Sequence, residues 1–148
     1  MRLRNYTDIP DEWIREVIRA VCPPGVSGFD VRVSNGESAR GRAYSNGHSY
    51  HDRACPLVIV AIPPAKKWKP VLRAAHKAYL PTVLGSRLEA TVMLLAHELR
   101  HLWQGGGPRK RRGMVWGARG KFSERDADAY ALGMLRRFRR GELTTEGK

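Results

Sequence analysis

The clearest secondary-structure signal in the chain is SRLEATVMLLAHELRHLWQ, residues 86–104. Its first four residues form an S-x-x-E capping box, in which the Ser86 hydroxyl accepts a hydrogen bond from a nearby amide and Glu89 reaches back. Apolar side chains cover much of the circumference of this segment, so we expect a helix that lies across the core. Three consecutive glycines, starting at Gly105, predict where the helix ends.

Within this helix, residues 97–101 read His-Glu-Leu-Arg-His. Residues four apart lie on the same helix face, so His97 and His101 can bind one ion while Glu98, turned by about a hundred degrees, flanks it. This spacing is typical of a catalytic zinc site, where the glutamate accepts a proton from water and passes it to a leaving amine. The motif also arises by chance in roughly one chain in a hundred of this composition, so a third ligand is needed.

The search for that third ligand is short, because no histidine follows His101 in the sequence. Carboxylates are the remaining candidates for the third ligand. The first of them lie in a segment for which we predict a helix from 124 to 140, with Ser123 as its N-cap. Glu124 and Asp128 share a face of that helix, so Glu124 could complete the zinc site and Asp128 could accept the ring N–H of a ligating histidine. An acidic cluster at a helix N-terminus is also a common electrostatic preference. The five candidates are Glu124, Asp126, Asp128, Glu142 and Glu146.

The rest of the chain predicts a single α+β domain over residues 1–148. Helical periodicity predicts a first helix over 11–21 and, beginning at Pro70, a short one over 70–79. Between them, β-type segments within 29–62 are separated by Asn-Gly turn signals, which predict three strands in a small antiparallel sheet packed on the 86–104 helix. We expect a basic surface loop over 105–122 and a frayed tail over 141–148.

The two chemical motifs together resemble those of the gluzincin clan of zinc metallopeptidases, in particular its compact members, the minigluzincins. The resemblance rests on the His-Glu-x-x-His run at 97–101 and on Glu124-x-x-Ala-Asp128-x-x-Ala, which together cover under a third of the chain. It implies a zincin-like fold and one Zn²⁺ per chain, with a strand edge that pairs with extended substrate, either LVIVAI or GRAYS. It also implies a role for each of five residues: His97, His101 and Glu124 as zinc ligands, Glu98 as general base and Asp128 as the group that orients a ligand.

One part of the thermolysin-like pattern is missing, because no histidine follows Glu124 to stabilise an oxyanion. Tyr130, Tyr79, His51 and an arginine within 109–119 are the candidates for that donor. His48 and His51 could form a second metal site instead, although they follow a turn signal and read more simply as surface histidines. A cysteine nucleophile, Cys22 or Cys55, is disfavoured because neither has a local cysteine-protease signature.

Charge is the other strong feature of the composition. The chain has 27 Lys and Arg against 14 Asp and Glu, a formal net charge of +13, which favours polyanions as neighbours. Four consecutive basic residues in the predicted loop are natural phosphate contacts: Arg109, Lys110, Arg111 and Arg112. The run RRFRR, residues 136–140 at the end of the last predicted helix, could contact phosphates as well. The sequence therefore predicts a zinc-dependent metalloendopeptidase acting on proteins or peptides. The alternatives are a nucleic-acid-associated protein with a structural or vestigial zinc site, and a protease that acts on nucleic-acid-bound proteins.

Three features predict a cytoplasmic protein with no membrane segment. The start of the chain has no apolar run behind its arginines, and the longest apolar stretch, Leu57 to Ile62, is far below the roughly 20 residues of a spanning helix. The chain has only 2 cysteines, which favours a reducing compartment.

Overall fold

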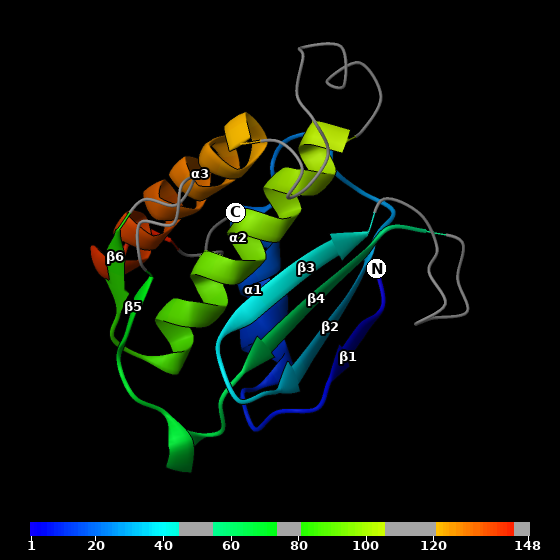
Figure 1. The fold of residues 1–148 in the computed structure, drawn as a ribbon. Helices are drawn as coiled ribbons and strands as arrows, with labels where there is room; N and C mark the ends of the chain where they lie inside the picture. Colours follow the sequence, from blue (N-terminus) through cyan, green and yellow to red (C-terminus); the bar gives the residue numbers. More distant parts are fainter. Residues whose placement is uncertain (45–54, 74–80, 106–120, 144–148) are drawn as a thin grey trace.

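The computed structural model describes residues 1–44, 55–73, 81–105 and 121–143. These residues form a mixed α+β arrangement with three α-helices, a four-stranded sheet and a two-stranded sheet (Figure 1). The elements, in chain order, are β1 (Leu3–Asn5), α1 (Asp11–Val21), β2 (Asp30–Asn35), β3 (Arg40–Tyr44), β4 (Leu57–Ile62), the 3-10 turn η1 (Ala65–Lys67), β5 (Val71–Arg73), β6 (Thr82–Leu84), α2 (Arg87–Gly105) and α3 (Lys121–Arg139).

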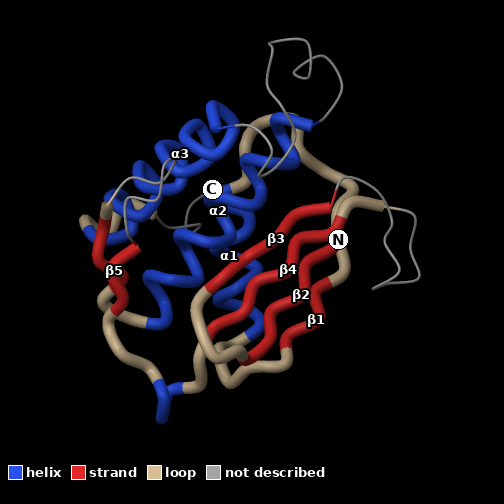
Figure 2. The backbone as a smooth tube through the Cα atoms, viewed as in Figure 1, coloured by secondary structure: helices blue, strands red, loops and turns tan. Residues whose placement is uncertain are grey.

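The four-stranded sheet is mixed, so the prediction of an antiparallel sheet is wrong. Its strand order is β1-β2-β4-β3 (Figure 2). Strands β1, β2 and β4 are parallel, and β3 is antiparallel to β4. The Asn35-Gly36 turn reverses the chain, but β4 lies between β2 and β3, and the Gly36 N–H bonds to Ile62 of β4. LVIVAI takes the centre because that position buries its apolar side chains and pairs its backbone on both sides. An edge strand exposes unpaired backbone to solvent, a position that the arginine-containing β3 tolerates better.

The predicted helix over 70–79 is also not found where the structure describes it. Val71–Arg73 is a strand that pairs antiparallel with Thr82–Leu84, and residues 74–80 lie outside the described part of the chain. Pro70 is compatible with the start of a helix and equally with the residue before a strand. Pairing with Thr82–Leu84 gives the segment after Pro70 its strand conformation.

Helix α2 lies in the core, as its apolar circumference predicts. Its buried side chains pack with α1 and with the inward face of the sheet, where Val58, Val60 and Ile62 of β4 alternate with residues of the opposite face. Helix α3 lies along the other side of α2, so the order across the molecule is α3, α2, β3 and then the rest of the sheet (Figure 1). Among the described residues, no helix is long and apolar enough to cross a membrane.

The helix ends agree with the sequence in part. Helix α1 has the bounds predicted for it, and Ser86 caps α2 through its hydroxyl, which accepts from the Glu89 N–H at 3.1 Å. The Glu89 carboxylate accepts from Gly85 rather than from Ser86, so the reciprocal bond of the capping box is displaced by one residue. Helix α3 begins at Lys121, so Ser123 is not its N-cap, and Gly141, with φ of 72°, follows its last turn.

Candidate metal centre

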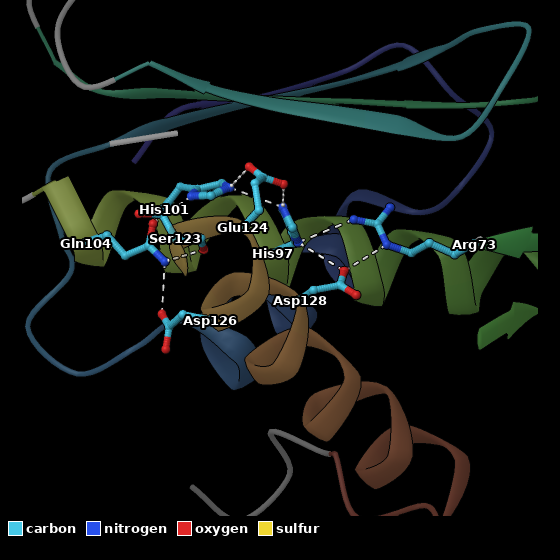
Figure 3. Close-up of polar contacts among 8 residues, drawn as sticks. All are labelled: Arg73, His97, His101, Gln104, Ser123, Glu124, Asp126 and Asp128. Atoms are coloured by element: carbon cyan, nitrogen blue, oxygen red, sulfur yellow. Dashed lines mark hydrogen bonds and ion pairs between the residues drawn. The ribbon is translucent and has the colours of Figure 1, made fainter. Parts of the chain in front are cut away.

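Two helices bring three side chains together at one buried point. His97 and His101 occupy successive turns of α2, and their Nε2 atoms are 3.1 Å apart. Glu124 of α3 spans them, with one carboxylate oxygen 2.8 Å from His101 Nε2 and the other 3.4 Å from His97 Nε2. All three residues are buried, and Figure 3 shows the carboxylate turned toward both rings. The structure thus brings together the three residues that the sequence predicts as metal ligands, and they could hold a metal ion.

Asp128 lies one turn beyond Glu124 and contacts the other side of the His97 ring. Its Oδ1 is 3.4 Å from His97 Nδ1, and the carboxylate is fully buried. Arg73 of β5 donates to the same oxygen at 2.9 Å, so a buried cation compensates the buried aspartate. Asp128 therefore stands where a carboxylate can fix the orientation of His97, as the sequence predicts.

Gln104 plays the corresponding part for His101. Its side-chain nitrogen donates to the Ser123 carbonyl at 2.8 Å and to Asp126 at 2.9 Å, so the amide oxygen must face the other way. That oxygen is 2.7 Å from His101 Nδ1. Because an amide oxygen only accepts, Nδ1 carries the proton and His101 Nε2 is left to bind an ion.

The chemistry of this cluster fits a cation. His101 Nδ1 faces the Gln104 oxygen, and His97 Nδ1 lies 3.4 Å from both Asp128 Oδ1 and Arg73 Nη2, so the two Nε2 atoms meet the Glu124 carboxylate at a point that positive charge would hold together. The electrostatics of the cluster also favour positive charge. Burial lowers the pKa of His97, but its hydrogen bonds to Asp128 and Glu124 raise it to about 9. Burial raises the pKa of Glu124, yet hydrogen bonds from His101 and His97 hold it well below its usual range.

Glu98 lies on a different side of α2, against the sheet. It is buried, and burial raises the pKa of its carboxyl group. A Cβ atom built on Gly41 of β3 would lie 2.9 Å from both Cγ and Oε2 of Glu98. Glycine at position 41 therefore lets the β3 backbone approach this carboxylate, a contact that the sequence alone did not indicate.

The other predicted third ligands are placed elsewhere. Asp126 points away from the histidine rings, as helix geometry predicts, and forms a two-pronged ion pair with Arg100 at 2.8 and 3.1 Å. Glu142 pairs with Arg140 at the end of α3, and Glu146 lies outside the described residues. Glu124 is thus the carboxylate that this fold directs at both histidines.

Several other sequence candidates can also be placed. The Tyr130 hydroxyl donates to the Val21 carbonyl at 2.6 Å, which commits it to the end of α1 rather than to an oxyanion. Cys22 and Cys55 are free thiols, and burial raises the pKa of Cys22, which opposes a thiolate nucleophile. The remaining candidates lie outside the described residues: His48, His51, Tyr79, the 109–119 arginines and the basic run Arg109, Lys110, Arg111 and Arg112.

Besides Gly41, sequence reasoning missed two residues of the site. Gln104 stands three residues after His101 on the same helix, so helical spacing could have identified it as a neighbour. Arg73 carries no such signal, because β5 is short and its approach to Asp128 depends on tertiary packing.

Comparisons of the chain with protein-family models, with curated proteins and with solved structures find no match.

Replacing Gln104 with methionine is expected to weaken metal binding without removing a ligand. The substitution leaves the His101 N–H and the Ser123 carbonyl without their partner, and loss of such supporting bonds costs about 10- to 100-fold in metal affinity. Zinc affinity measured by competition with a chromophoric chelator checks this, with circular dichroism to confirm folding. Glu12→Gln, at an exposed position of α1 away from the cluster, is the control. A dissociation constant for Gln104→Met within twofold of the control would show that Gln104 does not support the ligand.

Proposed function

We propose that this protein is a zinc-dependent metalloendopeptidase of the zincin type. The observation that carries the proposal is the convergence of His97, His101 and Glu124 on one point, with Glu98 buried beside them on the same helix. Two imidazoles and one carboxylate make three protein ligands, the number typical of catalytic zinc, whereas structural sites use four. A bound ion there would act as a Lewis acid on a peptide carbonyl and lower the pKa of water.

Glu98 supplies the proton transfer in this proposal. Its carboxylate would accept a proton from water and then donate it to the leaving amine, which requires a carboxyl group with a pKa above its usual value. Burial between α2 and β3 raises the Glu98 pKa in that direction. Asp128 and Gln104 would hold His97 and His101 with their Nε2 atoms directed at the ion.

The proposal assigns substrate binding to the edge of β3. Of the two strands that the resemblance allows, LVIVAI is β4 and has strand partners on both sides, while β3 pairs with β4 alone among the described strands. An extended peptide could add to β3 through main-chain hydrogen bonds. Since Gly41 of β3 contacts Glu98, a peptide along this edge would lie close to the proposed base.

Glu98→Gln should abolish most hydrolysis while zinc remains bound. The amide keeps the size of the carboxylate but cannot accept the proton, and general-base catalysis contributes about 10²- to 10⁴-fold. Turnover of a mixture of quenched fluorescent peptides, together with zinc per chain by elemental analysis, measures both parts. Glu12→Gln makes the same chemical change at an exposed position of α1 and should keep full activity. Equal turnover by the two variants would contradict the mechanism, and a zinc-loaded wild type that cleaves no peptide would favour a structural ion.

Gly41→Ala should lower kcat by about 100-fold without releasing zinc. The new methyl group would push the Glu98 carboxylate aside, and a displacement of about 1 Å in a catalytic group can cost that much. Steady-state kinetics on the same peptides measure the effect. In the control Gly133→Ala, a Cβ meets nothing within 4 Å, so kcat should not change while the helix gains about 1 kcal/mol. An unchanged kcat in Gly41→Ala would show that close approach of β3 is not required.

A further inference from the structure

The outward face of the four-stranded sheet is rich in arginine. Side chains alternate along a strand, so in β3 Gly41 faces Glu98 while Arg40 and Arg42 point to the opposite face. The same alternation in β2 places Arg32 opposite the buried Val31 and Val33. The main buried cluster takes its strand side chains from the inward positions, although Leu57 and Ala61 on the outward face are also buried.

The strand register aligns the arginines in one row across the sheet. Arg4 pairs with Arg32, Arg32 with Ile59, and Ile59 with Arg42. With strands about 4.8 Å apart, this row is about 14 Å long. Arg40 stands two residues from Arg42 on the same face. We call this surface the arginine face; its strand residues are Arg4, Asp30, Arg32, Ser34, Arg40, Arg42, Tyr44, Leu57, Ile59 and Ala61.

The net charge of the arginine face is positive. Four of its strand residues are arginines and one is an aspartate, Asp30, which is buried and accepts a hydrogen bond from the Arg2 backbone. Arg40 and Arg42 are exposed, and within the described part of the chain neither they nor Arg4 forms an ion pair. Like charges placed close together oppose folding, so this density of arginine suits a surface that meets an anion.

The arginine face is hollowed and not purely polar. A cavity of about 640 Å³ lies over its β3 side, and both arginine residues and apolar or aromatic residues line it. Its walls include Arg40, Arg42, Tyr44, Ile59 and Ala61. Such a surface can contact flat apolar groups and phosphates together, because arginine forms two-pronged bonds to phosphate and also stacks on planar rings.

We propose that the arginine face binds single-stranded nucleic acid. Phosphates would pair with Arg4, Arg40 and Arg42, and unpaired bases would lie on Tyr44 and Ile59. A duplex fits less well, because its bases are stacked inside and its major groove admits a helix or two-stranded ribbon rather than the face of a four-stranded sheet. This site is separate from the basic run at 109–112 and does not depend on the metal centre, which lies beyond the opposite face of the sheet.

The test is binding of a fluorescein-labelled 20-nucleotide oligo-dT to the full chain, followed by fluorescence anisotropy between 50 and 200 mM salt. The double variant Arg40→Gln/Arg42→Gln should bind at least 10-fold more weakly at the lower salt. Its slope of log K against log salt should fall by about 1.4, roughly 0.7 for each lost phosphate contact. Arg125→Gln/Arg136→Gln removes the same charge from exposed positions of α3 and should change affinity less than threefold. Circular dichroism confirms that both variants fold.

Three results would overturn the proposal. Equal losses in the two double variants would mean that binding follows net charge or α3. Tighter binding of a 20-base-pair duplex than of oligo-dT would exclude recognition of unpaired bases, and equal binding of a poly-glutamate chain would show a surface for acidic protein segments. In Glu98→Gln the oligo-dT affinity should equal that of the wild type, which separates this proposal from the proposed peptidase activity.

Discussion

The contact between the Glu124 carboxylate and the two histidine rings is the constraint on which the rest of the structure depends. Burying a carboxylate is costly unless partners surround it, and these partners stand on a different helix. The fold meets that requirement by fixing α3 to α2 at both ends. Gln104 bonds to Ser123 and Asp126 near the first turn, and Arg139 pairs with Glu89 near the last. Between these two ends, Arg73 anchors Asp128 beside the His97 ring.

The two helices of the site were predictable because their signals are local. Residues 97–101 share a helix face by spacing alone, and the pairing of Glu124 with Asp128 follows from the same geometry. The strands were less predictable, because a turn signal such as Asn35-Gly36 shows that the chain reverses but not which strand it then joins. That choice depends on burying LVIVAI at the centre of the sheet. The contacts of Arg73 and Gly41 are tertiary and leave no mark in the sequence.

Strand β3 contributes to both the proposed peptidase site and the arginine face. Gly41 on its inward side allows Glu98 to pack against the backbone, while Arg40 and Arg42 on its outward side form part of the arginine face. Its other edge, on which the described residues place no strand, lies between these two faces. Strand alternation therefore lets one short segment serve a proposed peptidase site and a proposed nucleic-acid site without competition for the same side chains. A protease so built could act on proteins that are themselves bound to nucleic acid.

The most direct test of the central claim is the zinc content of the purified protein and of Glu124→Gln, each prepared without chelator and analysed by elemental mass spectrometry. Glu142→Gln, which alters an exposed carboxylate at the end of α3, is the matched control. The account predicts close to one zinc per chain in the wild type and the control, and a marked loss in Glu124→Gln. Absence of zinc from the wild type after reconstitution, or equal zinc in all three proteins, would contradict it.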